Sequence, residues 1–234
     1  MPFPKFVLSM DNLKAGRFAP LLSTLVLVLF VLHPLLRPFP LMALTIDITF
    51  IVVLVAACYA VADSHRALIV SVLTVLFAVA CGVLGTLYDS TALHIISDLL
   101  TVFFFGYIAL TILDRVLNTK SFTLDSIFGA VCVYILIGVM WAFIYSLIEE
   151  VSPGSFSVSS ALEGSAGGAV RPGELFIYYS FVTLTTLGYG DISPVSGIAR
   201  MMASLEAIVG PMFVAILVAW LVSEAASTMS SSEQ

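Results

Sequence analysis

Long runs of apolar residues, separated by short polar segments, occupy most of the chain. A helix needs about 20 apolar residues to cross a membrane, and six runs reach or approach that length. They lie at residues 19–36, 41–62, 67–88, 92–113, 125–148 and 197–222. The connections between the first four runs are short, which is typical of antiparallel neighbouring helices. The pattern therefore predicts an all-α polytopic membrane protein with six transmembrane helices.

One further apolar run is too short to cross a membrane. Residues 151–173 are rich in Ser and Gly and indicate a flexible outer loop, and residues 175–186 are then apolar again. A segment of this kind has to enter from the outside and stop partway. Irregular backbone at membrane depth is tolerated only where it is buried in protein or lines a wet cavity. We therefore expect a re-entrant half-helix at 175–186, with the residues after it lining a pore.

The composition narrows the class of protein. Apolar residues make up 60% of the chain, charged residues 10%, the mean hydropathy is +1.12 and the net charge is −6. A soluble domain carries about 25% charged residues, so a water-facing globule is excluded. The nine Lys and Arg residues form no patch suited to nucleic acid. We expect membrane lipid as a partner, no nucleic acid, no organic cofactor and, since the spans leave no room for a soluble domain, no enzymatic activity.

The distribution of basic residues predicts the orientation, because cytoplasmic loops carry more Lys and Arg than outer loops. With a cytoplasmic amino terminus, the inner side holds Lys5, Lys14, Arg17, Arg66, Arg115 and Lys120, and the outer side holds Arg37, Arg171 and Arg200. Both termini are then cytoplasmic. The short loops and the lack of a cleavable targeting peptide favour a prokaryotic plasma membrane.

A seven-residue motif follows the half-helix. Residues 185–191 read Thr-Thr-Leu-Gly-Tyr-Gly-Asp. The motif resembles the selectivity filter of potassium channels, in which a dehydrated potassium ion takes its shell of oxygen atoms from consecutive backbone carbonyls that all point the same way. An extended strand alternates its carbonyls, so some residues must adopt left-handed conformations. Glycine does so without a Cβ penalty, which explains Gly188 and Gly190.

This segment resembles the selectivity filter of potassium channels, in which a short pore helix precedes T-T-V/I/L-G-Y-G-D. The resemblance implies a filter at 186–190 whose carbonyls bind K⁺ ions. The filter residues are Thr186, Leu187, Gly188, Tyr189 and Gly190, with K⁺ held at the first four of them. It also implies that the Thr186 hydroxyl completes the innermost site, and that the function is passive, potassium-selective permeation.

The resemblance further implies a set of residues that support the filter. Thr185 precedes it, and Tyr178 and Tyr179 occupy the positions of an aromatic pair in the pore helix. We expect Tyr189 to pack against that helix. Asp191 would accept a hydrogen bond from Tyr178 or raise the local concentration of cations at the mouth.

One filter segment cannot surround an ion, and the chain shows no second copy. Geometry and resemblance together imply a homotetramer of four chains around one axis. An alternative is a subunit that conducts only within a hetero-oligomer. A separate regulatory subunit is also left open.

The last span fits the inner helix of such a channel. Gly210 matches a hinge glycine of potassium channels, and Pro211 follows it, so a gating bend is expected there. The alternative is a glycine needed for close packing. Pro211, Val214 and Val218 match positions that line the cavity in relatives.

Glu206 lies one turn before Gly210, and a carboxyl group inside a membrane is functional by default. We expect it to form a hydrogen bond with the pore helix behind the filter, near Thr183 or Thr185. The alternative is an acid that faces the cavity and attracts cations.

The fourth span departs from the voltage-gated pattern, in which arginine recurs every third residue. Here it holds His94 and Asp98 but no Lys or Arg, and Arg115 lies just beyond it. Moving one charge through 100 mV is worth about 2.3 kcal/mol, so we expect little or no intrinsic voltage dependence. His94 and Asp98 form either a proton sensor or a locally satisfied pair, and no role is assigned to Asp47.

The sequence shows no regulatory domain, so it does not identify the stimulus that opens the channel. A constitutive leak is one alternative.

These inferences divide the chain into four parts. Residues 1–18 form a cytoplasmic segment that is either frayed or an interfacial helix, and residues 19–123 form four helices like a voltage sensor without its charges. Residues 124–222 form the pore domain, and residues 223–234 a short cytoplasmic tail. Within the pore domain, the inner helix spans 197–222.

A different class of function uses some of the same residues. Residues 188–191 also match G-x-G-D of intramembrane aspartyl proteases, and Tyr88-Asp89 supplies a second Tyr-Asp pair. Two carboxyl groups that share a proton are the chemistry required. This hypothesis leaves Thr185, Thr186 and the half-helix unexplained, and Asp89 falls in a short connector, so the channel is favoured.

Overall fold

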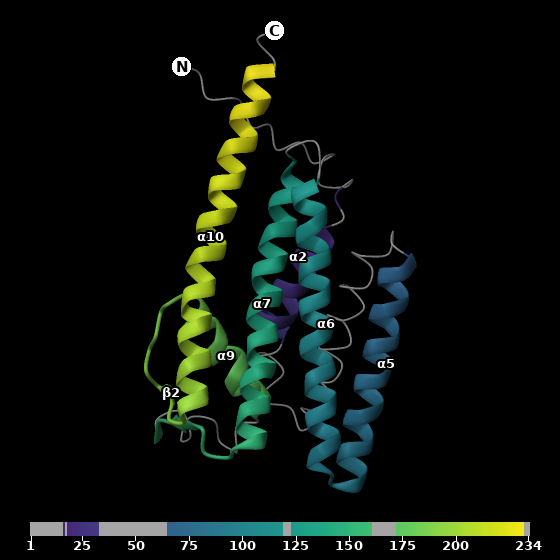
Figure 1. Ribbon diagram of the computed structural model, residues 1–234, viewed down its shortest axis with the longest axis vertical. Coiled ribbons are helices and arrows are strands. Elements are labelled where there is room, and N and C mark those ends of the chain that lie inside the picture. The colour runs from purple at the N-terminus through teal and green to yellow at the C-terminus, as the bar shows by residue number, and fades with distance from the viewer. Residues whose placement is uncertain (1–15, 17, 33–64, 119–122, 161–171, 232–234) are drawn as a thin grey trace. The chain divides into compact units, whose positions relative to one another are not determined.

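The computed structural model describes residues 16, 18–32, 65–118, 123–160 and 172–231, and these are mostly helical. In chain order the elements are α2 (Phe18–Val26), the π-helix η1 (Leu27–Leu32), α5 (His65–Tyr88), α6 (Thr91–Asn118), α7 (Leu124–Val151), β1 (Phe156–Val158), α9 (Pro172–Leu184), β2 (Ile192–Pro194) and α10 (Gly197–Ser231). Figure 1 shows them with the same labels.

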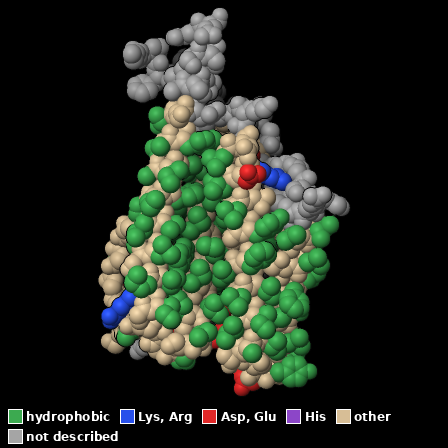
Figure 2. Space-filling model, in the orientation of Figure 1, with side chains coloured by type: hydrophobic (Ala, Val, Ile, Leu, Met, Phe, Trp, Pro, Cys, Tyr) green, Lys and Arg blue, Asp and Glu red, His purple; other side chains and the backbone are tan. Residues whose placement is uncertain are grey.

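Four of the described helices are long and apolar enough to cross a membrane. The apolar stretches are Leu68–Tyr88, Thr91–Asn118, Leu124–Val151 and Gly197–Trp220. On the face shown in Figure 2, hydrophobic side chains cover the middle of the helices and charged side chains lie toward their ends. A water-soluble protein cannot expose such surfaces. The chain is a multi-pass membrane protein.

The expected first span at 19–36 is described only as far as residue 32. Over that part it is helical, with nine residues in α2 and a further six in η1, and its last four residues are not among those described. The span expected at 41–62, with Asp47, lies outside the described residues. The six-helix topology therefore stays a prediction.

The last helix is longer than expected. The apolar stretch of α10, Gly197–Trp220, agrees with the expected span at 197–222, but the helix itself continues to Ser231 and includes most of the expected tail. The segment after 222 contains Glu, Ala and Met, which favour helix, and no Gly or Pro to stop it. At its start, the Ser196 hydroxyl caps α10 by accepting a hydrogen bond from the amide of Ala199 at 3.2 Å.

The chain forms two compact units. One comprises residues 1–68 and 111–133, and the other comprises residues 69–110 and 134–234. This division cuts through α6 and α7 and does not follow the boundary at 123–124 that the sequence predicts. The domain boundary at 123–124 therefore stays a prediction. In the first unit, Asp125 of α7 accepts a hydrogen bond from the Phe18 amide at 2.9 Å and so holds the start of α2.

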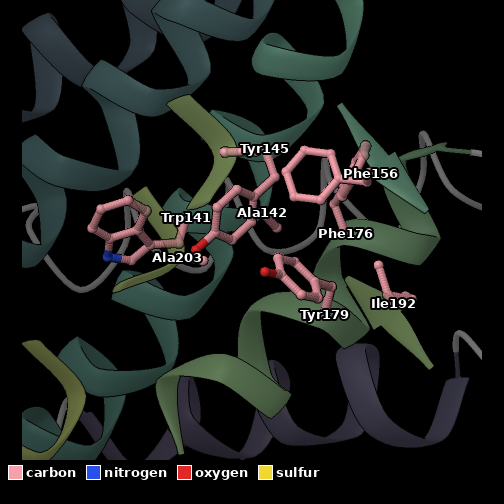
Figure 3. Close-up of a cluster of buried hydrophobic side chains, with 9 residues drawn as sticks. Trp141, Ala142, Tyr145, Phe156, Phe176, Tyr179, Ile192 and Ala203 are labelled. Atoms are coloured by element: carbon pink, nitrogen blue, oxygen red, sulfur yellow. The ribbon is translucent and has the colours of Figure 1, made fainter. Parts of the chain in front are cut away.

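The second unit has its core around an aromatic cluster. Its buried members come from α7, β1, α9, β2 and α10, and they are Trp141, Ala142, Tyr145, Phe156, Phe176, Tyr179, Ile192, Ala199 and Ala203. Figure 3 shows the rings of Tyr145, Phe156, Phe176 and Tyr179 gathered together. The centroids of Tyr145 and Tyr179 are 4.9 Å apart and meet edge to face, a favourable arrangement for aromatic rings. The cluster joins the short helix α9 to the long helices.

Part of the outer loop is more ordered than its composition suggests. Residues 151–173 were expected to be flexible, but β1 pairs antiparallel with β2, with Ser157 opposite Ser193. Glu149 at the end of α7 accepts hydrogen bonds from the amides of Gly154 and Phe156, at 2.7 and 3.2 Å. The described part of the loop therefore connects the end of α7 to the segment that follows residues 185–191.

Candidate functional site

The short helix α9 and the motif after it form one continuous feature. Pro172 occupies the first helical position, where its missing amide costs nothing. The helix ends at Leu184, two residues before the expected end at 186. Figure 1 shows α9 beside the much longer α10, and the two helices are in contact.

The amide groups of residues 185–188 all turn back toward α9. They donate hydrogen bonds to carbonyl oxygens in its last turns: Thr185 to Phe181 at 3.1 Å, Thr186 to Thr183 at 2.9 Å, and Leu187 and Gly188 to Val182 at 2.9 and 3.2 Å. Among the described residues, no donor reaches the carbonyl oxygens of residues 186–189. One edge of the segment is thus tied to the helix, and the carbonyls of 186–189 stay available to an external partner.

The backbone of this segment alternates in handedness. Thr186, Gly188 and Gly190 have φ of +58°, +57° and +76°, whereas Leu187 and Tyr189 do not have positive φ. The left-handed conformation expected of the two glycines is confirmed. Thr186 was not expected to share it, and its conformation explains why α9 stops at Leu184. Alternation of this kind turns successive carbonyls toward the same side, unlike an extended strand.

The side chains of the motif are exposed in the single chain. Leu187 is 55% exposed and Tyr189 is 66% exposed, whereas Tyr179 is buried in the aromatic cluster. Tyr189 acts electrostatically on Tyr178 of α9, but most of its side chain is exposed, so its packing against the pore helix stays a prediction.

Asp191 closes the motif and is held on both sides. The Tyr178 hydroxyl donates to Oδ2 of Asp191 at 2.6 Å, as expected, and the Ser159 amide donates to its backbone carbonyl oxygen at 2.9 Å. Partial burial, followed by the hydrogen bond to Asp191, raises the pKa of Tyr178 to about 12. The phenol therefore stays protonated and keeps donating throughout the physiological pH range.

Glu206 of α10 is fully buried and contacts two other helices. Oε1 lies 2.5 Å from the hydroxyl of Ser180 on α9, and Oε2 accepts a hydrogen bond from the Tyr145 hydroxyl on α7. The hydrogen bond to the helix before the motif is as expected, and the residue that forms it is Ser180, three residues before Thr183. The alternative of an acid facing a cavity does not fit a side chain with 0% exposure.

The sequence did not identify Tyr145 and Ser180. Both stand out as hydroxyl-bearing residues in otherwise apolar runs, and a buried carboxyl group requires such donors. Their pairing with Glu206 could not be deduced, because it joins positions 61 and 26 residues away in the chain.

Gly210 lies directly against the end of α9. A Cβ atom placed on Gly210 would overlap the carbonyl oxygen of Leu184, the residue before the motif. The Tyr134 hydroxyl donates to the same oxygen at 3.3 Å. These contacts give Gly210 a close-packing role. Since α10 is continuous through Gly210 and Pro211, the hinge stays a prediction.

The remaining expected residues lie on other surfaces. Val214 and Val218 on α10 are 45% and 52% exposed in the single chain, which leaves them available to line a cavity. On α6, Asp98 shares a hydrogen bond with Ser146 of α7 and is attracted by His94 of its own helix, whereas Glu150 of α7 repels it. The partners of Asp98 therefore come from α7 as well as from its own helix. Asp89 lies in the turn between α5 and α6, as expected.

The comparison with protein families agrees with an ion channel, and two bacterial proteins are similar in sequence. A family model described as ion channel matches residues 171–226. Protein LctB of Geobacillus stearothermophilus is 33% identical over 100 residues, which cover 43% of this chain and 72% of the relative. Protein LctB of Bacillus caldotenax is 31% identical over 104 residues, covering 44% and 75%. No solved structure gives a significant match.

Proposed function

We propose that this chain, which belongs to the family of the LctB proteins and carries an ion-channel domain at residues 171–226, is a potassium-selective channel for passive permeation. The ion-channel domain supports the conduction of ions. Selectivity for potassium rests on the geometry of residues 185–191 and on their resemblance to a known filter.

The observation that carries the proposal is the alternating backbone, whose carbonyls at 186–189 accept no hydrogen bond from the part of the chain that the structure describes. Three positive φ values at every second residue, together with amides tied to α9, leave the oxygens of residues 186–189 free on the opposite edge. Rows of such oxygens replace the hydration shell of K⁺ in potassium-selective filters. We assign the K⁺ sites to the carbonyls of Thr186, Leu187, Gly188 and Tyr189.

A single strand of carbonyls cannot enclose an ion, so the proposal includes a homotetramer. Four chains would bring four filter segments to one axis. The exposed Leu187 and Tyr189, and the exposed apolar residues Met201 and Leu205 of α10, would then be covered by neighbouring copies. A hetero-oligomer in which another subunit completes the ring is the alternative.

The proposed topology has six membrane-spanning helices and both termini in the cytoplasm. The four long helices supply four of the spans, and the basic residues favour this orientation. The two LctB relatives come from bacteria, which supports a prokaryotic plasma membrane. Membrane lipid is then the partner of the outward-facing helices, and K⁺ in the filter is the cargo.

Flux through vesicles tests the proposal. Purified protein in liposomes loaded with potassium and diluted into sodium is expected to release potassium, and barium is expected to block the release. Empty liposomes are the control. Protein that assembles as a tetramer but passes sodium as readily as potassium would contradict the assignment of the filter.

Weak voltage dependence is a further expected property. Between Thr91 and Asp114, α6 carries no Lys or Arg, so it cannot supply the several charges per subunit that steep gating requires. Each charge that crosses the membrane contributes about 2.3 kcal/mol per 100 mV, and a helix without such charges gains almost nothing from the voltage. Recordings in planar bilayers are therefore expected to show an open probability that changes little across ±100 mV. A steep conductance–voltage curve with a gating current would overturn this.

Asp191→Asn separates the channel from the protease hypothesis. An asparagine keeps an oxygen for the Tyr178 hydroxyl, which donates at 2.6 Å, so a channel is expected to go on conducting potassium with altered inactivation or stability. An aspartyl protease would lose all activity, because it needs both carboxyl groups. Parallel flux and peptide-cleavage assays on the wild type and the variant measure both.

A further inference from the structure

Around Glu206, the number of close contacts between oxygen atoms exceeds the number of hydroxyl hydrogens that could form hydrogen bonds in them. The hydroxyl oxygen of Ser180 lies 2.7 Å from the carbonyl oxygen of Gly138 and 2.5 Å from Oε1 of Glu206. The Tyr145 hydroxyl contacts the other carboxyl oxygen. Each hydroxyl carries one hydrogen. Three contacts between oxygen atoms are therefore served by two hydroxyl hydrogens.

An ionised Glu206 would leave one of these contacts without a hydrogen. Ser180 would donate either to Gly138 or to Glu206, and its oxygen would face the other acceptor lone pair to lone pair. Both Ser180 and Glu206 are 0% exposed, so water cannot relieve the repulsion. A hydrogen on Glu206 completes the set: Glu206 donates to Ser180, Ser180 donates to Gly138, and Tyr145 donates to Glu206.

Among the described residues, the surroundings of Glu206 offer hydroxyl groups but no cationic partner for a negative charge. The groups that act on Glu206 are the hydroxyls of Tyr145 on α7 and Ser180 on α9, and the more distant phenols of Tyr134 and Tyr179 on the same two helices feel its charge. On α10 itself, the described basic residue Arg200 donates to the carbonyl oxygen of Pro194. A buried charge without a cationic partner is costly.

We infer that Glu206 acts as a neutral carboxylic acid whose hydrogen holds the filter-bearing helix α9 in position. The hydrogen joins α10 to Ser180, and Ser180 joins α9 to Gly138 of α7. Because α9 receives the amide hydrogen bonds of residues 185–188, its position sets that of the carbonyls that follow. The effect on conduction rests on the proposed function, whereas the count of hydrogens does not.

The proton on Glu206 makes the contact between α7, α9 and α10 dependent on pH. Loss of the proton leaves Ser180 with one hydrogen for two acceptors, so the connection from α9 to either α7 or α10 is broken. Since the intact arrangement holds this proton, its contribution to stability is present at low pH and is lost as the pH rises. Thermal stability and potassium flux are both expected to fall as the pH is raised.

Glu206→Gln and Glu206→Leu form the test. A glutamine amide reproduces the neutral acid, because its carbonyl accepts from Tyr145 and its NH₂ group donates to Ser180. Leucine has a similar volume and offers neither. The leucine variant is expected to lose flux, and the glutamine variant to rescue it and to remove the pH dependence of flux and of thermal stability. Equal loss of flux in both variants would overturn the inference.

Infrared spectroscopy of the purified protein separates this inference from the proposed function. Comparison of the wild type with Glu206→Gln is expected to show a protonated carboxyl band near neutral pH that only the wild type has. A carboxylate band in its place would overturn the inference even if potassium flux is observed. A protonated band in a protein without potassium flux would support the assignment of the proton and contradict only the proposed function.

Discussion

Replacing Gly188 with alanine is expected to abolish potassium-selective conduction. Gly188 has φ of +57°, and nothing lies within 4 Å of a Cβ placed on it. The damage would therefore come from the backbone conformation alone, at about 1–2 kcal/mol for a residue with a Cβ. In a tetramer this occurs four times around one ion, and the expected relief is rotation of the peptide, which would remove its carbonyl from the ring. Reversal potentials of the reconstituted variant measure the loss.

Gly154→Ala is the matched control. Gly154 also has positive φ, +84°, and open space around its Cβ position, but it lies in the turn before β1. The Gly154→Ala variant is expected to lose a similar amount of folding stability as Gly188→Ala and to keep its selectivity for potassium. Unchanged selectivity and conductance in Gly188→Ala would show that residues 186–190 are not the filter.

Gly210→Ala is expected to destabilise the protein and prevent conduction. In an unobstructed helix this change stabilises by about 1 kcal/mol, so any loss must come from the overlap of the new Cβ with the Leu184 carbonyl oxygen. That oxygen belongs to the backbone and cannot rotate away. Overpacking of this kind costs about 1–3 kcal/mol, and Leu184 directly precedes the filter segment. Thermal unfolding and potassium flux of the purified variant measure the two effects.

Gly197→Ala provides the comparison on the same helix. A Cβ at Gly197 meets nothing within 4 Å, so this variant is expected to be at least as stable as the wild type and to conduct like it. If Gly210 were important only as a hinge, Gly210→Ala would unfold at an unchanged or higher temperature and alter only the probability of opening. That result would contradict the packing role.

The sequence predicts the parts of this fold that depend on local pattern. The four long helices follow from the length of their apolar runs, and the left-handed Gly188 and Gly190 follow from the demands of a row of carbonyls. Segment ends were less accurate: α10 extends to Ser231 and α9 ends at Leu184. The second difference depends on the positive φ of Thr186, which residue type alone does not indicate.

Contacts between distant segments could not be predicted in the same way. Strand β1 has only three residues and exists because β2, which follows the motif, pairs with it. The residue of α9 that contacts Glu206 could not be chosen for a similar reason. Ser180, Thr183 and Thr185 all lie on the same short segment, and only the rotation of α9 against α10 selects Ser180. Such choices arise from packing, which periodicity does not encode.

The most direct test of the central claim is the reversal potential of the purified protein in a planar bilayer, with potassium on one side and sodium on the other. The account predicts a value near the potassium equilibrium potential, abolished in Gly188→Ala and retained in Gly154→Ala. A value near zero with current present would contradict it, because the carbonyls of residues 186–189 would then not select potassium.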